Sequence, residues 1–211
     1  MSLAPVIALS HGGGPMPALG DETHRDIVRS LKNRVPQILK LGTPSQPRAI
    51  VLVTAHWQTH KPTVSSIAKP SLIYDYYGFP DEAYKLKYPA AGDPEVARQV
   101  RDALEAEGLE AELDETRGWD HGVFIPMMLV HPRADVPIVQ MSVLRSEDPV
   151  AHLRVGAALA RLRADNVAIV GSGFASWHNL GTMRTLMQGS GPAVARLREQ
   201  SRQWGRALDG A

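Results

Sequence analysis

The fold is decided by the stretch Ala49-Ile50-Val51-Leu52-Val53-Thr54-Ala55-His56-Trp57. An unbroken run of apolar and β-branched residues is typical of a strand that is buried on both faces, as in a parallel sheet. His56 lies at the carboxyl end of this run. Three other stretches bring a histidine to a similar place, and the carboxyl ends of parallel strands share one edge of the sheet, where such folds bind ligands. The histidines of these stretches are His11, His121 and His178.

Strands and helices alternate along the rest of the chain. Further strands are expected at 5–11, 109–113, 136–143 and 167–171. Helices are expected at 21–38, 93–108, 148–162 and 192–208, from apolar residues at helical spacing and from capping residues at their starts. Pro36 is expected to kink or split the first helix. The pattern predicts an α/β fold with a largely parallel or mixed central sheet flanked by helices, and with the functional site at the carboxyl ends of the strands.

Composition limits the function classes. The chain has 211 residues, a length typical of one domain, and a formal net charge of +1, so nothing indicates a basic face for nucleic acid. No apolar run approaches a membrane span and the N-terminus does not resemble a signal peptide, which predicts a cytoplasmic protein with no membrane partner. Composition leaves open whether the protein forms a homo-oligomer. Because the chain has no cysteine, a bound metal ion would be held by imidazole and carboxylate groups.

A glycine-rich turn, Gly12-Gly13-Gly14-Pro15, follows the first predicted strand. The turn leaves His11 at an open strand end. Neither the GxGxxG spacing of dinucleotide-binding folds nor the GxxxxGK[ST] spacing of a P-loop is present. The turn is therefore not expected to bind a nucleotide.

A long segment from Gln58 to Pro94 is rich in Pro, Tyr and Gly, and Tyr74-Asp75-Tyr76-Tyr77-Gly78-Phe79-Pro80 is too irregular for a regular element. Long loops in small domains are usually functional or disordered. The aromatic side chains are candidates to line a pocket for a planar ring, and the alternative is that they only pack the loop onto the domain. The substrate-binding candidates are Trp57, Tyr76 and Phe79.

The other four histidines receive no functional role. His24 and His152 fall on the first turns of predicted helices, where a histidine is usually solvated or caps the helix. His60 lies just past the central strand and is expected to be exposed. His131 precedes a proline in a turn and is expected to be structural.

Four histidines at one edge indicate a metal site. Neutral imidazole suits iron, zinc, copper and nickel, and a few such ligands with open positions are found both in non-haem Fe(II) oxygenases and in catalytic zinc sites. The residues alone leave these two chemistries open. Asp120 and Asn179, next to His121 and His178, are expected to orient the two rings by hydrogen bonds.

The histidine motifs resemble those of a known enzyme family. In chain order they are Ser10-His11-Gly12-Gly13, Thr54-Ala55-His56-Trp57, Trp119-Asp120-His121-Gly122, Gly171-Ser172-Gly173 and His178-Asn179-Leu180. With this order and these separations, the chain resembles the class III extradiol ring-cleavage dioxygenases, and within them the 4,5-DOPA dioxygenase branch. The resemblance covers nearly the whole chain and includes Gly78-Phe79-Pro80 and Tyr88-Pro89-Ala90, which are similar to the central loop of the family.

The resemblance implies a single metal ion, Fe(II) in active dioxygenases and sometimes zinc in the isolated protein. It implies that His11 and His56 are metal ligands, and that His178 is the acid/base beside the metal and also within metal reach. His121 corresponds to a histidine close to the substrate, with a catalytic role. The implied substrates are a small aromatic diol, such as a DOPA-like catechol, and dioxygen, both atoms of which are inserted as the ring opens.

The chain departs from the family pattern near its end. The family places a last metal ligand, a histidine or glutamate, in a C-terminal segment, and this chain ends at Ala211 without a matching motif. The expected catalytic domain over residues 1–211 is therefore a shortened family member, or part of a longer protein, or completes its site with His178.

Three function classes follow. The first is a metal-dependent extradiol dioxygenase that acts on a small catechol. The second is a zinc-dependent hydrolase that uses the same histidines to activate water. The third is a non-catalytic metal-binding homologue, because a fold does not by itself determine function.

Overall fold

The computed structural model describes residues 3–173, 181–182, 185–186 and 189–210. They group into two compact units, Met1–Gly173 and Phe174–Ala211, which we describe separately. The single-domain organisation expected from the length stays a prediction. Residues 174–180 lie outside the described residues, so the expectations for His178 and Asn179 stay predictions.

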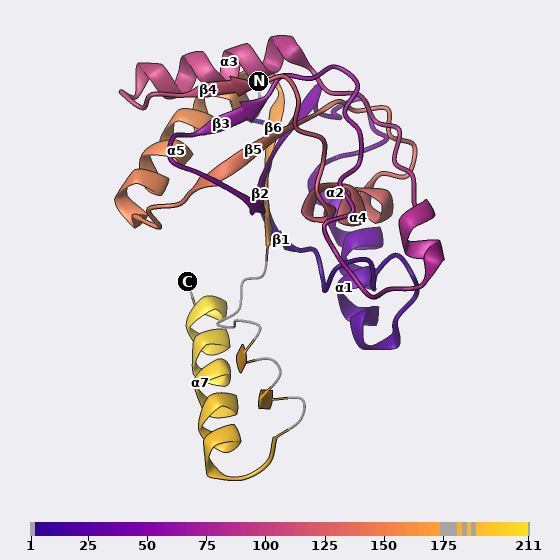
Figure 1. The fold of residues 1–211 in the computed structure, drawn as a ribbon. Coiled ribbons are helices and arrows are strands. Elements are labelled where there is room, and N and C mark those ends of the chain that lie inside the picture. Colours follow the sequence, from indigo (N-terminus) through magenta and orange to yellow (C-terminus); the bar gives the residue numbers. More distant parts are fainter. Residues whose placement is uncertain (1–2, 174–180, 183–184, 187–188, 211) are drawn as a thin grey trace. The chain divides into compact units, whose positions relative to one another are not determined.

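A six-stranded mixed sheet forms the centre of the first unit (Figure 1), in the order β1-β6-β2-β5-β3-β4. β1, β6, β2 and β5 run parallel, β3 is antiparallel to β5, and β4 is parallel to β3. The α/β fold with a mixed sheet flanked by helices is confirmed. The strands are β1 (Val6–Ser10), β2 (Ala49–Thr59), β3 (Thr63–Ser65), β4 (Glu112–Asp114), β5 (Ile138–Leu144) and β6 (Val167–Gly173).

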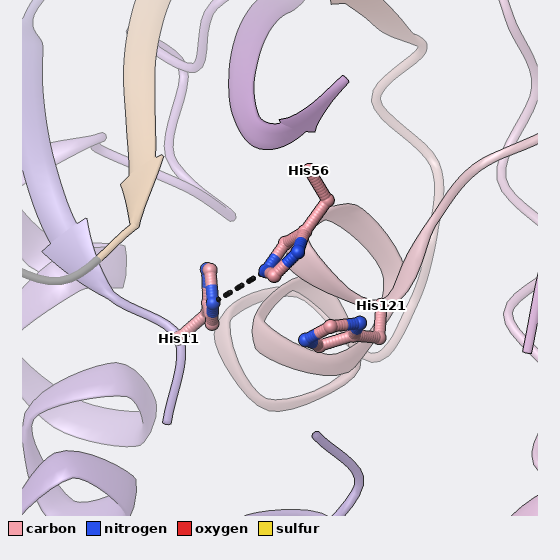
Figure 2. A group of neighbouring side chains, drawn as sticks. All are labelled: His11, His56 and His121. Atoms are coloured by element: carbon pink, nitrogen blue, oxygen red, sulfur yellow. Dashed lines mark hydrogen bonds between the residues drawn. The ribbon is translucent and has the colours of Figure 1, made fainter. Parts of the chain in front are cut away.

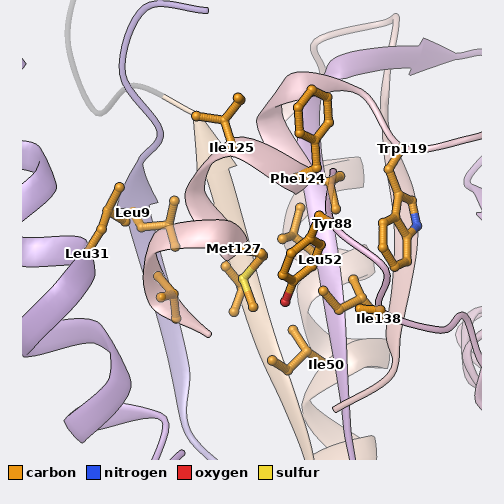
Figure 3. Close-up of a cluster of buried hydrophobic side chains, with 14 of the residues drawn as sticks. Leu9, Leu31, Ile50, Leu52, Tyr88, Trp119, Phe124, Ile125, Met127 and Ile138 are labelled. Atoms are coloured by element: carbon orange, nitrogen blue, oxygen red, sulfur yellow. The ribbon is translucent and has the colours of Figure 1, made fainter. Parts of the chain in front are cut away.

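A buried cluster of apolar side chains covers each face of the sheet. Alternate residues of the central strand β2 point to opposite faces and so join different clusters. Ile50 and Leu52 join one buried cluster with Trp119 and Phe124 (Figure 3). Their neighbour Val51 joins a second cluster on the other face. Helices α3 (Pro94–Ala106) and α5 (Pro149–Leu162) contribute to the second cluster, and α4 (His121–Val130) to the first.

The first predicted helix is interrupted, as Pro36 suggested. After a 3₁₀ turn at Glu22–His24, α1 (Arg25–Arg29) passes into a π-helical turn at Ser30–Arg34 and then into α2 (Val35–Ile38). The backbone N–H of Val35 donates to the carbonyl of Ser30, five residues back. Proline has no N–H to continue the i→i−4 pattern, and a wider turn just before it accommodates the missing bond.

Three elements of this unit were missed by the sequence patterns. Strand β3 and a 3₁₀ turn at Asp81–Lys85 lie inside the segment expected to be irregular. Helix α4 has no polar face, since eight of its ten residues are buried, and a helix that is apolar all round shows no helical periodicity. The remaining short helix of the unit is a 3₁₀ turn at Arg163–Asp165.

The second unit contains helix α7 (Pro192–Asp209), close to the range 192–208 expected from the sequence. It begins with a proline, which is common at the first helical position because the backbone N–H there has no partner within the helix. In the described part of the chain, no helix is both long and apolar enough to cross a membrane.

Candidate metal centre

Three of the four predicted histidines meet beyond the carboxyl edge of the sheet (Figure 2). His11 follows β1 directly, His56 lies near the end of β2, and His121 is the first residue of α4. One nitrogen from each ring lies within 4.8 Å of the other two. The Nε2 atoms of His11 and His56 are 3.0 Å apart. His11 and His121 are buried, with 1% and 7% of their surface exposed, whereas His56 is exposed.

An irregularity in β2 places His56. The register with β5 shifts between Val53 and Gln58, and such a bulge re-aims side chains near functional sites. Inside it, the backbone N–H of His56 donates to the hydroxyl oxygen of Thr54 at 3.2 Å. His56 is thereby turned toward the other two histidines at the end of an otherwise buried strand.

The ring of His11 is oriented by a chain of three groups. Pro126 lies inside α4 and has no N–H, so it leaves the carbonyl of Gly122, four residues earlier, without a helical partner. The Ser172 hydroxyl donates to this carbonyl. A hydroxyl has one proton, so toward His11 Nδ1, 3.0 Å away, the Ser172 oxygen is the acceptor. His11 Nδ1 therefore carries a proton, and in the neutral ring the unprotonated nitrogen is Nε2, which lies on the side of His56.

The ring of His121 is oriented by Asp75, not by its sequence neighbour Asp120 as expected. Asp75 Oδ1 lies 2.8 Å from His121 Nδ1 and also accepts the backbone N–H of His121 at 2.9 Å. Burial raises the pKa of Asp75, but the hydrogen bonds from the His121 ring and backbone outweigh it, and the pKa lies below its usual value. The carboxylate is ionised and can only accept, so His121 Nδ1 carries a proton.

The Asp120 carboxylate is the shared acceptor of a buried hydrogen-bond network. It is fully buried, and it accepts hydrogen bonds from Thr54 Oγ1 at 2.8 Å, Gln140 Nε2 at 3.2 Å and Arg117 at 3.0 Å. The bond to Thr54 joins Asp120 to the bulge that carries His56. The expectation that Asp120 orients His121 was wrong because the carboxylate points to β2 and β5 instead of along its own helix.

The surroundings of Gly122 leave no room for a side chain at this position. A Cβ atom at this position would lie 2.8 Å from Thr54 Oγ1 and 2.9 Å from His56 Cδ2. Real Cβ contacts are longer, so any side chain here would displace the bulge or the His56 ring. The close approach of α4 to β2 therefore depends on the absence of a side chain.

His24 contacts the glycine turn that follows His11, contrary to the expectation of a solvated side chain. Its Nε2 accepts the backbone N–H of Gly13 at 3.0 Å, and its Nδ1 lies 2.9 Å from Asp21. In the sequence, the glycine-rich turn after a strand-end histidine is only a weak indication of such a partner. His152 likewise accepts the backbone N–H of Leu144 at 3.1 Å.

The other two histidines lie as expected. His60 is exposed. His131 is buried and paired with Asp135 at 2.5 Å. Neither lies in the histidine cluster.

The aromatic candidates differ in their surroundings. Tyr76 is buried, its hydroxyl donates to the carbonyl of Ala83, and its ring centre lies 6.0 Å from that of His121. Burial, then the neighbouring Tyr74 and Tyr84 hydroxyls and the Asp75 carboxylate, raise the pKa of Tyr76 to about 12, so the hydroxyl stays protonated. Phe79 packs edge-on against Tyr76, and the Arg117 guanidinium lies 4.8 Å from the ring centre of Trp57. Their role in substrate binding stays a prediction.

The residues present suit a divalent metal ion. Two nitrogen ligands about 2.1 Å from one ion and at right angles lie roughly 3.0 Å apart, which is the His11–His56 separation. Partial removal from water, followed by repulsion from His121, lowers the pKa of His56. A lowered pKa favours the neutral imidazole that binds metal.

Comparison with known proteins identifies the family. The family model described as the catalytic LigB subunit of aromatic ring-opening dioxygenase matches residues 5–210. The chain belongs to this family. The match spans the three clustered histidines and β1 through β6, so the family assignment covers the whole site described above.

Named relatives agree with the family. The chain is 60% identical over 213 residues to dioxygenase tasH of Hapsidospora irregularis, covering 99% of this chain and 66% of that protein. It is 37% identical to a 4,5-DOPA dioxygenase extradiol of Beta vulgaris and 36% identical to one of Escherichia coli, covering 82% and 85% of this chain. It spans 63% and 62% of those two proteins.

A solved structure shares the fold. A crystal structure of an uncharacterised protein of Escherichia coli K12 matches with a TM-score of 0.57 at 32% identity. The match covers 74% of this chain and 55% of the other. The chain thus represents little more than half of that structure and about two thirds or less of the relatives named above.

Stability of the metal-free protein is expected to fall as the pH decreases below about 6.5. The unfolded chain takes up a proton at His56 near its ordinary pKa of 6.5, whereas folding lowers the pKa of this ring. Between the lowered pKa of the folded state and the ordinary pKa of 6.5, the unfolded state binds more protons than the folded state. The stability that His56 contributes above pH 6.5 is therefore lost as the pH falls through this range. Chemical unfolding across the pH range should show a steeper loss for the wild type than for His56→Gln, and identical slopes would contradict the prediction.

Proposed function

We propose that the protein is a metal-dependent extradiol dioxygenase that opens the ring of a small catechol. The observation that carries the proposal is the convergence of His11, His56 and His121 in a chain that belongs to the family of ring-opening dioxygenases. The 4,5-DOPA dioxygenases among the relatives support a DOPA-like catechol as substrate. Dioxygen is the second substrate, and both of its atoms enter the ring-opened product.

In this proposal His11 and His56 hold the metal, with Fe(II) as the active ion and zinc as an ion that the isolated protein also binds. Their Nε2 atoms are 3.0 Å apart, and the Ser172 hydroxyl keeps the Nδ1 proton of His11 away from the ion. When bound, Fe(II) would lower the pKa of a catechol hydroxyl and supply the redox chemistry at its open positions. We assign no further metal ligand among the described residues.

His121 acts on the substrate in this proposal. Asp75 holds its Nδ1 proton, so the neutral ring presents Nε2 as an acceptor on the side of the other two histidines. An unprotonated Nε2 can accept the proton of a catechol hydroxyl, because this nitrogen is an acceptor in the neutral ring and an ionised carboxylate stabilises the resulting cation. His178 is proposed as a second acid/base group on its motif alone.

The test is oxygen uptake by protein that is purified without air and loaded with Fe(II). With a DOPA-like catechol we expect one dioxygen consumed per catechol and a ring-opened, yellow product. Zinc-loaded protein is the matched control and should show the background rate. Uptake at the background rate across a panel of catechols, with iron bound, would reject the proposal, and ester or amide hydrolysis by the zinc form would favour the hydrolase.

A further inference from the structure

Asp75 lies 46 positions before His121 in the chain and contacts it twice with the same oxygen. Asp75 Oδ1 is 2.8 Å from the ring Nδ1 and accepts the backbone N–H at 2.9 Å. One carboxylate oxygen therefore restrains both the main chain and the ring of His121. Two bonds to one residue define the ring orientation more closely than a ring contact alone.

The start of α4 needs an acceptor that its own N-cap residue does not supply. Asp120 occupies the N-cap position, but its side chain makes no capping hydrogen bond, because it is bonded to Thr54, Gln140 and Arg117. The backbone donors of a first helical turn require outside partners. Asp75 supplies one for His121, and its negative charge also suits the positive end of the helix.

The segment on either side of Asp75 is anchored. The Tyr74 hydroxyl donates to the carbonyl of Leu86 at 2.6 Å, and the Tyr76 hydroxyl donates to that of Ala83 at 2.7 Å. The Tyr74 ring packs edge-on against Phe124 of α4, with ring centres 5.7 Å apart. Asp75 is thus held between two fixed side chains and does not reach His121 from a freely moving loop.

We propose that Asp75 is a positioning residue that sets the tautomer and the orientation of His121. Its carboxylate retains the proton on Nδ1, which keeps Nε2 unprotonated and directed to the side of His11 and His56. The consequence for turnover rests on the proposed function, whereas the consequence for the tautomer does not. No contact of Asp75 with a metal ion or substrate is involved.

The tautomer can be measured without metal or substrate. In ¹⁵N-labelled, metal-free protein at alkaline pH, long-range ¹H–¹⁵N spectra distinguish the two neutral forms of each histidine, and His121→Gln identifies the signals of His121. We expect the Nδ1–H form in the wild type and in Asp75→Asn, whose amide oxygen can still accept. In Asp75→Ala we expect a mixture dominated by the Nε2–H form that free imidazole favours.

The chain offers a control in another His–Asp pair, in which the buried ring of His131 contacts the exposed carboxylate of Asp135. Asp135→Ala should change the spectrum of His131 and leave that of His121 unchanged. An Nε2–H form of His121 in the wild type would overturn the proposal, and this result does not require any variant to fold. An unchanged Nδ1–H form in Asp75→Ala would overturn it as well.

Turnover provides the second measurement. In Fe(II)-loaded protein we expect kcat of Asp75→Ala to fall by roughly 10–100-fold, the usual effect of removing a residue that orients an active-site histidine, with less change in KM and in metal content. Asp75→Asn should recover most of the loss, and Asp135→Ala should match the wild type. A kcat of Asp75→Ala equal to that of the wild type would overturn the role in turnover. If the wild type itself shows no catechol turnover while the tautomer results hold, the proposed function fails and the positioning role stands.

Discussion

Replacing His56 with alanine is expected to remove the bound metal and, with it, catechol turnover. His56 Nε2 lies 3.0 Å from His11 Nε2, and the variant leaves His11 without the partner with which it would share the ion. We expect the metal affinity to fall by more than the roughly 10–100-fold that follows loss of a residue that only hydrogen-bonds a ligand. Metal content after dialysis against a weak chelator measures this loss directly.

Two other histidines serve as comparisons for His56. His60 is exposed, lies four positions later and has no place in the cluster, so His60→Ala should keep both metal and turnover. His178→Ala should keep most of the metal and lose roughly 10²–10⁴-fold in turnover, as expected for a lost proton-transfer group. Full metal occupancy in His56→Ala would reject its role as a ligand, and equal metal loss in both variants would reject the acid/base role of His178.

Replacing Asp120 with alanine is expected to destabilise the protein by about 3–5 kcal/mol, the range for removing one partner of a buried ion pair. The carboxylate is fully buried, and its loss would leave Arg117, Thr54 and Gln140 without their shared acceptor. Arg117 Nε and Gln140 Oε1 already have no hydrogen-bond partner among the described residues. Denaturant unfolding of the metal-free protein measures the effect.

A second Asp–Arg pair provides the control for Asp120. Asp102 pairs with Arg101 on the surface of α3, where ion pairs contribute little because water and salt screen them. Asp102→Ala should therefore leave the unfolding midpoint close to that of the wild type. If Asp120→Ala behaved in the same way, the buried network would not be the support of the bulge at His56.

The sequence by itself determined the elements that carry the site. The apolar run at 49–57 predicted a strand buried on both faces, and the structure shows Ile50 and Val51 in clusters on opposite sides of the sheet. Parallel strands with histidines at their ends predicted the convergence of His11 and His56. Each strand could be read from the sequence because its pattern depends on residues that are neighbours along the chain. The convergence follows because the carboxyl ends of parallel strands share one edge of the sheet.

Helix α4 shows where such patterns stop being informative. Its start at His121 could not be located because the helix is buried nearly all round and lacks a polar face to produce a helical period. Pro126 inside it is also unusual for a helix interior. Only in the folded chain does Ser172 supply the Gly122 carbonyl with the partner that Pro126 cannot offer.

The tertiary structure alone decided how each ring is held. Asp120 is adjacent to His121 in sequence but bonds to β2 and β5, whereas Asp75, 46 positions away, orients the ring. Ser172, 161 positions from His11, does the same for that histidine. Local patterns specify which residues form a strand or a helix. A hydrogen bond between distant side chains depends on how those elements pack, and adjacency along the chain does not determine the direction in which a side chain points.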